Sequence, residues 1–86
     1  MGRTIEIEIT ESEKELKEMM NHQNHARFLE RLQMLYWIKT KQFGSLQEIA
    51  DRLGRSKSVL VLWLRSYREK GLAGLLEWRE HSYIDR

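Results

Sequence analysis

Gly54 separates two segments that are each patterned as an amphipathic helix. Ser45 and Glu48 have the spacing of a capping box, in which each side chain accepts a hydrogen bond from the backbone at the other residue, so we expect a helix to begin at Ser45. Its apolar residues recur at helical spacing and are expected to be buried: Leu46, Ile49, Ala50 and Leu53. Gly54 fits the position just past the helix, where the backbone turns left-handed and a residue without a Cβ does so at little cost.

The second segment predicts a longer helix with one buried face. Ser56 is the best N-cap residue, and Lys70 followed by Gly71 is the usual signal for a helix end. The positions i, i+3, i+4 and i+7 are apolar or aromatic: Leu60, Trp63, Leu64 and Tyr67. Residues 45–70 therefore predict a helix-turn-helix, whose second helix, with a diameter of about 10–12 Å, fits the major groove of DNA.

The side chains that point away from the predicted core indicate where this surface would contact DNA. Base contacts are expected from the start and the outer face of the second helix, at Lys57, Ser58, Leu62 and Arg65. Arg65 is the best candidate for bidentate recognition of guanine. Phosphate contacts are expected from Ser45, Gln47, Arg55 and Arg68.

Two adjacent aliphatic residues, Val61 and Leu62, interrupt this polar surface. An aliphatic side chain can contact the methyl group of thymine in the major groove, so DNA binding is not excluded. An exposed apolar pair equally indicates a surface that contacts protein. The alternative function is therefore a protein-interaction or dimerisation module that reads no DNA, with Val61, Leu62 and Trp37 as its contact patch.

Several motifs resemble a known family. They are Leu53-Gly54-Arg55-Ser56-Lys57-Ser58, Trp63-Leu64, Tyr67-Arg68, the segment from Gly71 to Leu76, and the helix from Arg27 to Lys41. Together they resemble the amino-terminal helix-turn-helix region of mariner-related bacterial insertion-sequence transposases, notably cyanobacterial ones. The resemblance implies a module that binds the ends of a mobile element, coupled in full-length relatives to a metal-dependent acidic catalytic domain that is absent here. Those relatives usually carry polar or basic side chains at the positions of Val61 and Leu62.

Composition limits the class of protein. The 86 residues, 41% of them hydrophobic, suit one small domain, and the absence of cysteine excludes disulfides and thiolate chemistry. The net charge of +2 is mild, but it is unevenly distributed: the first 18 residues hold six glutamates against three basic residues, whereas residues 52–70 hold six basic residues against one glutamate. The positive charge thus falls on the second helix, as attraction to phosphate requires.

The first ten residues predict a strand-like arm over residues 3–10. Ile5, Ile7 and Ile9 alternate with polar residues, but a single strand has no partner in a helical domain. Its backbone must pair with another copy of the chain, with a later extended segment or with water. We therefore expect a homodimer formed through this arm, the alternative being a frayed or differently docked arm. The interface candidates are Ile5, Ile7, Ile9, Trp37 and Val61.

Three further helical segments complete the expected fold. They are an acidic helix over residues 11–22 capped by Thr10 or Ser12, a helix over 25–41, and a short closing helix over 72–79. The middle helix has an apolar face made of Phe28, Leu29, Leu32, Leu35 and Tyr36. Trp37 lies nearly opposite that face, so we expect it to pack on the stripe of Leu16, Met19 and Met20 or on the same stripe of a dimer mate. The fold class is an all-α domain of three to five helices with a strand-like arm.

The function expected from these observations is sequence-directed binding of double-stranded DNA by a transposase-derived module, either an end-binding module or a small transcriptional regulator. The sequence shows no acid pair, no nucleophile beside a base and no glycine-rich phosphate loop, so we expect neither an enzyme nor a cofactor. His22 and His25 have the spacing of metal ligands, but solvated histidines are the favoured interpretation. Without a signal pattern or a membrane-spanning run, we expect a cytoplasmic, nucleoid-associated bacterial protein.

Overall fold

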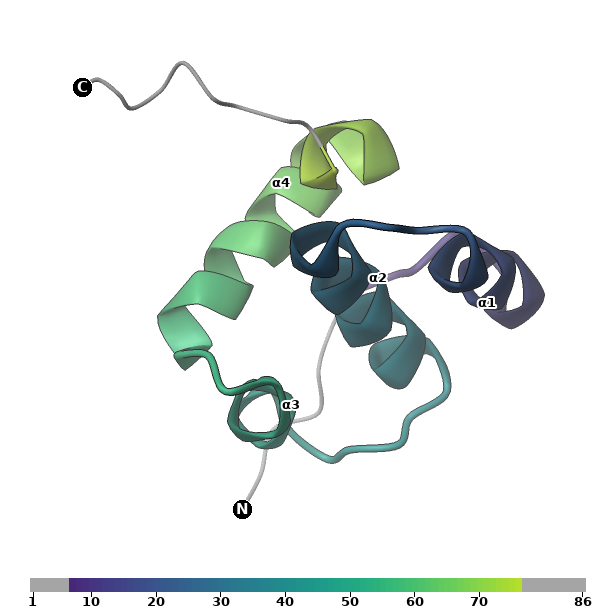
Figure 1. Ribbon diagram of the computed structural model, residues 1–86. Helices are drawn as coiled ribbons and strands as arrows, with labels where there is room; N and C mark the ends of the chain where they lie inside the picture. The colour runs from purple at the N-terminus through teal and green to yellow at the C-terminus, as the bar shows by residue number, and fades with distance from the viewer. Residues whose placement is uncertain (1–6, 77–86) are drawn as a thin grey trace.

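The computed structural model describes residues 7–76 and consists of helices (Figure 1). They are α1 (Glu13–Asn21), α2 (Ala26–Lys39), α3 (Leu46–Leu53) and α4 (Lys57–Leu75). Helix α2 lies between α1 and α4, and α3 lies beside the start of α4 (Figure 1). The all-α fold is confirmed for this part of the chain, and no strand occurs between residues 7 and 76. Across the same residues, no helix is long and apolar enough to cross a bilayer.

Helix α1 begins with a complete capping box. The Glu15 backbone N–H donates to Ser12 Oγ at 3.1 Å, and the Ser12 N–H donates to Glu15 Oε1 at 2.8 Å, so Ser12 rather than Thr10 is the cap. Only Leu16 of this helix is fully buried, while Met19 and Met20 are partly buried against the core. The narrow apolar stripe predicted for this segment therefore packs against α2.

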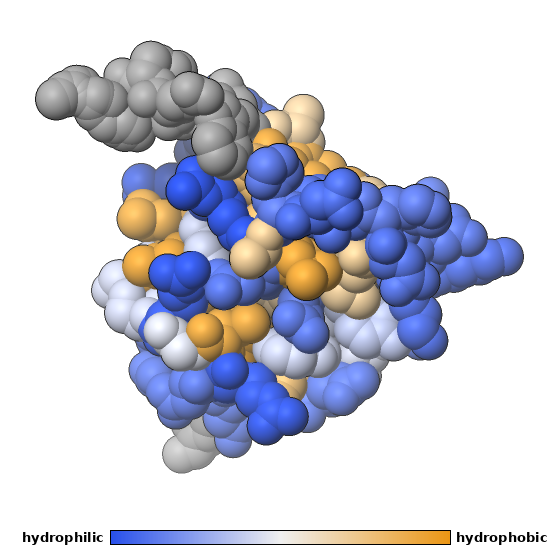
Figure 2. All heavy atoms as spheres, viewed as in Figure 1, coloured by the Kyte–Doolittle hydropathy of each residue, from blue (hydrophilic) through white to orange (hydrophobic). Residues whose placement is uncertain are grey.

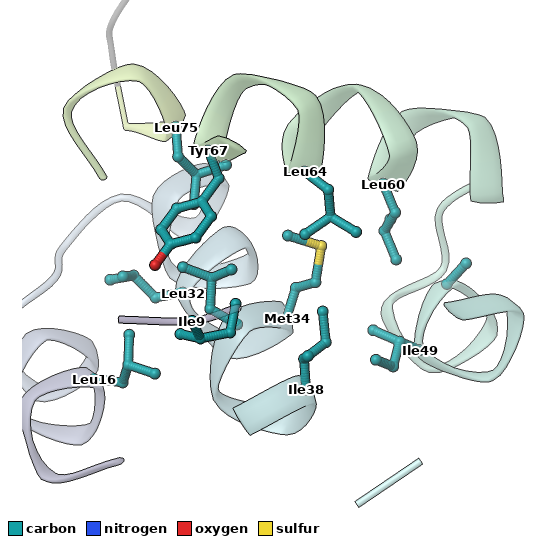
Figure 3. Packing of buried hydrophobic residues seen from close by; sticks show 12 residues of the cluster. Ile9, Leu16, Leu32, Met34, Ile38, Ile49, Leu60, Leu64, Tyr67 and Leu75 are labelled. Carbon is teal, nitrogen blue, oxygen red and sulfur yellow. The ribbon is translucent and has the colours of Figure 1, made fainter. Parts of the chain in front are cut away.

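Helix α2 supplies more buried residues to the described core than any other helix, because it is covered on two sides. Its buried residues are Phe28, Leu32, Met34, Leu35 and Ile38. Figure 3 shows Met34 directed toward Leu64 of α4, whereas Leu32 lies on the side of Tyr67 and Leu16. The prediction of a single apolar face omitted Met34 and Ile38, and two residues assigned to that face, Leu29 and Tyr36, are only partly buried.

The segment before α1 docks on its own domain instead of forming a strand. Ile9 is 5% exposed and belongs to the core. Its carbonyl oxygen accepts a hydrogen bond from Lys39 Nζ at 2.8 Å, and the Thr10 N–H donates to the Tyr67 hydroxyl oxygen at 3.0 Å. The Ile9 carbonyl and the Thr10 N–H are thus hydrogen-bonded to side chains of α2 and α4. The pattern of residues in the sequence does not reveal these partners.

This docking corrects the predicted arm for the residues that the structure describes. Residues 7–10 are not a strand, and the side chain of Ile9 is covered within the chain, so it is not available to a dimer interface in this conformation. Ile7 is partly buried against the same core. Ile5 and the rest of residues 3–6 lie outside the described residues.

Helix α4 changes direction at Gly71. This residue has φ 68° and ψ −157°, a region of backbone conformation that is essentially restricted to glycine. The kink brings Leu75 into the core at 1% exposure, with Leu72 and Leu76 partly buried beside it. The helix predicted over residues 72–79 is therefore seen as a short continuation after the kink, and its end beyond Leu76 lies outside the described residues.

Removal of the Tyr67 hydroxyl should lower the free energy of unfolding and make it less dependent on pH in the alkaline range. Tyr67 is 5% exposed and donates to Glu11 Oε1 at 2.5 Å, and burial together with this bond raises the pKa of the phenol above its ordinary value of about 10. The stabilisation is therefore complete below about pH 10 and is lost as pH rises through the raised pKa. Tyr67→Phe should reduce the free energy of unfolding by about 1 kcal/mol at neutral pH.

Urea unfolding of both proteins between neutral pH and about pH 10.5 measures this effect. The two curves of stability against pH should converge at the alkaline end, because the hydroxyl stabilises the fold only while it is protonated. A constant difference at every pH would contradict the assignment.

Candidate nucleic-acid interface

The first helix of the predicted helix-turn-helix begins at its predicted cap, with one difference in the hydrogen bonding. Ser45 Oγ accepts from the Glu48 N–H at 3.3 Å. The Glu48 carboxylate, however, accepts from the N–H of Gly44 at 2.9 Å and not from that of Ser45. The reciprocal half of the predicted box is thus displaced by one residue.

The turn has the left-handed conformation that the sequence predicts. Gly54 has φ 73° and ψ 29°. Its N–H donates to the Asp51 carbonyl at 3.3 Å, and the N–H of Arg55 donates to the Ala50 carbonyl at 3.0 Å. This pair of bonds is the Schellman arrangement, which satisfies the last carbonyls of α3 and fixes the direction in which the chain leaves it.

Helix α4 then begins at Ser56, whose Oγ accepts from the Val59 N–H at 3.3 Å. Its inner face is buried as predicted at Leu60, Leu64 and Tyr67. Trp63 is only partly buried, and the guanidinium of Arg31 covers its ring at 5.1 Å from the centroid. The same arginine lies 5.6 Å from the centroid of Phe28, so it connects α2 to the middle of α4.

The outer face of α4 is exposed over its whole polar length. The four residues predicted to contact bases are all exposed: Lys57, Ser58, Leu62 and Arg65. Val61 and Leu62, at 48% and 57% exposure, are the large hydrophobic residues that stand out from the described surface. Figure 2 shows hydrophobic atoms along the outer edge of α4 with hydrophilic atoms around them. Exposure is what a contact surface requires, but the contacts themselves stay a prediction.

The predicted phosphate contacts lie at the start of α3, in the turn and on α4, and their side chains differ in the hydrogen bonds that they already make. Arg68 is exposed on the flank of α4. Gln47 donates through Nε2 to Asp51 Oδ1 at 2.9 Å, and Ser45 is occupied as a cap acceptor, although its hydroxyl hydrogen can still be donated. Arg55 forms an ion pair with Glu30, with 2.8 Å between Arg55 Nη2 and Glu30 Oε1.

Comparison with protein families assigns this arrangement. The model of the Homeodomain-like domain, a helix-turn-helix family, matches residues 25–76, more than half of the chain. The chain belongs to the Homeodomain-like family. No curated protein and no solved structure showed a significant match.

The Homeodomain-like domain comprises α2, α3 and α4, so α1 and the docked residues 7–12 precede it. Within it, sequence reasoning missed Glu30 and Arg31, which lie on α2 and contact the turn and α4. Desolvation, followed by the nearby positive charges of Arg27 and Arg55, lowers the pKa of Arg31. Arg31 Nη1 donates to the Leu75 carbonyl at 2.8 Å. No periodicity in the sequence indicates these contacts, because they join residues that are 25 to 44 positions apart.

Other candidate residues have local roles. His22 Nδ1 lies 2.9 Å from the Glu18 carbonyl, and no group of three potential metal ligands occurs among residues 7–76. Trp37 is partly buried with its ring edge-on to Phe43, at a centroid distance of 5.2 Å. Its ring partner is thus the loop before α3, whereas the sequence had indicated the stripe of α1 or a dimer mate.

The left-handed turn of the Homeodomain-like domain can be tested at Gly54. Gly54→Ala should lower the free energy of unfolding by about 1–2 kcal/mol, because a Cβ strains this backbone conformation. Gly44→Ala is the matched control, since Gly44 does not have a positive φ and the nearest atom to an added Cβ is Glu48 Oε1 at 3.8 Å. Urea unfolding should show the control to be neutral or slightly stabilised. Equal losses in the two variants would contradict the assigned strain.

Proposed function

We propose that this Homeodomain-like domain binds double-stranded DNA in a sequence-directed manner, with α4 in the major groove. The observation that carries the proposal is the outer face of α4, where Lys57, Ser58 and Arg65 are exposed above a buried face of Leu60, Leu64 and Tyr67. A helix held in this way can enter the groove without giving up its packing.

The residues divide into two roles in this proposal. Arg65 would donate two hydrogen bonds to guanine, and Lys57 and Ser58 would reach base edges near the start of α4. Leu62 would contact a thymine methyl group, which gives its exposure a function. Phosphates would be bound by Arg55 and Arg68 through their charges and by Ser45 and Gln47 through neutral donors at the start of α3.

The distribution of charge supports this orientation. Helix α4 carries Lys57, Arg65, Arg68 and Lys70 against Glu69, whereas α1 carries three glutamates against two lysines. These two helices lie on opposite sides of α2 (Figure 1). An approaching polyanion would therefore meet the positive side of the domain first.

The rival proposal is a protein-interaction module that uses Val61 and Leu62. Their exposure favours it, and both lie on the same outer face as Arg65. Trp37, the third member of the expected patch, is partly buried against Phe43, so this patch depends mainly on two aliphatic side chains. The polar and basic residues around these side chains favour DNA.

The origin and assembly of the module are narrower proposals. The motifs from Leu53 to Leu76 support descent from a mariner-related insertion-sequence transposase, as an end-binding module or a small transcriptional regulator. The homodimer stays a prediction, and in this conformation Ile9 would not contribute to its interface.

Duplex binding at several salt concentrations tests the proposal directly. After selection of a binding site from random duplexes, the affinity of the wild-type chain should fall roughly tenfold from about 50 to 200 mM salt, as expected for the two phosphates neutralised by Arg55 and Arg68. Arg65→Ala should weaken binding roughly ten- to a hundredfold and relax preference at one position of the site, because a bidentate contact is lost.

Leu62→Arg distinguishes the two proposals. If DNA is the ligand, an added positive charge on the outer face should leave the affinity unchanged or improve it. If a protein is the ligand, an arginine in the apolar pair should abolish its binding, which salt should hardly affect. Failure of the wild-type chain to retain any duplex at low salt would reject DNA binding.

The proposed role of Leu62 has a test of its own. Replacement of thymine by deoxyuridine in the selected site removes one methyl group, whose burial is worth about 0.8 kcal/mol, so affinity should fall about fourfold at the contacted position. Leu62→Ala should bind both duplexes equally. A thymine preference that persists in this variant would assign the methyl contact to another residue.

A further inference from the structure

Glu30 and Arg55 form a geometrically specific pair at the start of α4. Arg55 Nε donates to Glu30 Oε1 at 2.9 Å, and Arg55 Nη2 lies 2.8 Å from the same oxygen. Two donors that converge on one oxygen fix the plane of the guanidinium as well as its position. The Arg55 backbone is also fixed, because its N–H donates to Ala50 in the turn.

The positive charges around the pair explain why the Arg55 side chain needs Glu30 to stay in this position. Desolvation lowers the pKa of Arg31 most, Arg27 and Arg55 lower it further by charge repulsion, and Glu30 raises it, so Glu30 lies among three guanidinium groups. Without the carboxylate, the positive charge of Arg31 would repel Arg55 and favour other rotamers of its long side chain.

Relative exposure shows which partner lies outside. The Arg55 side chain is 46% exposed and that of Glu30 is 26% exposed. Glu30 uses Oε1 to hold one edge of the guanidinium, and no hydrogen bond within residues 7–76 uses Nη1 of Arg55 at the other edge. A phosphate near the start of α4 would therefore meet the arginine before the glutamate.

We propose that Glu30 is a positioning residue that orients Arg55 to bind a DNA phosphate beside the start of α4. The inference rests on the proposed function, DNA binding through α4, and assigns a role on α2 that the helix-turn-helix itself does not contain. The benefit is entropic: an arginine that is already ordered loses less rotamer freedom when the phosphate binds.

Variants at both positions test the proposal on the selected duplex. Glu30→Ala should weaken binding about two- to tenfold, the cost of ordering one long side chain, although it removes a negative charge. Glu30→Gln loses the same charge but keeps an oxygen acceptor for Nε–H, so it should bind more tightly than Glu30→Ala. Arg55→Ala should weaken binding and reduce the slope of log affinity against log salt by about one.

The decisive comparison uses the Arg55→Ala background. There, Glu30→Ala and Glu30→Gln should bind DNA equally, because the side chain that they position is absent. With Arg55 present, tighter DNA binding by Glu30→Ala than by the wild type would show that the carboxylate competes with phosphate. Equal affinity of Glu30→Ala and the wild type would show that the ion pair has a purely structural role. Either result overturns the proposal.

Parallel measurements separate this proposal from failures of folding and of the proposed function. Urea unfolding should change little in all variants, since a partly exposed ion pair contributes about 0–1 kcal/mol. If the wild-type chain binds duplex and Glu30→Ala binds it with the same affinity, the proposed function is retained and the role of Glu30 is rejected. A wild-type chain that binds no duplex rejects both.

Discussion

The two-sided burial of α2 is the constraint on which the rest of this structure depends. Five of its side chains are buried, and no single neighbouring helix could cover them all. Helix α1 and the docked residues before it cover one side, and α3 and α4 cover the other (Figure 1). Because α4 packs through one face only, its opposite face remains in contact with solvent. The exposure of Arg65 and Leu62 is therefore a consequence of how the core closes.

Local signals predicted the helix-turn-helix well. The caps at Ser45 and Ser56 and the left-handed glycine at position 54 depend on neighbours within a few residues, and each is found in the structure. Contacts between distant segments could not be predicted in this way. The alternation around Ile9 shows only that one side of the segment is apolar, and it therefore predicted a strand. It does not show that Lys39 donates to the Ile9 carbonyl or that Tyr67 accepts from the Thr10 N–H. The second buried face of α2 was missed for the same reason. The sequence shows that Met34 is apolar, but only the position of α4 in the fold buries it.

The candidate interface combines elements that fulfil different physical requirements. The turn sets the direction in which the chain leaves α3, and the buried face of α4 holds this helix on the core. Glu30 of α2 holds Arg55 beside the start of α4. Predicting the exposed residues required only the helical period, whereas the pairing of Glu30 with Arg55 required the tertiary fold. If α4 enters the major groove as proposed, the exposed aliphatic pair would meet the apolar methyl group that each thymine presents there.

Under the proposed function, the kink at Gly71 would also limit how much DNA sequence one domain reads. From Lys57 to Lys70, before the kink, α4 is about 21 Å long at the rise of an α-helix. That length spans roughly six base-pair steps if the helix lies along the groove, and fewer if it crosses at an angle. Beyond Lys70 the chain turns back toward the core, where Leu75 is buried and its carbonyl is bonded to Arg31. A longer target would have to be covered by an additional reading element.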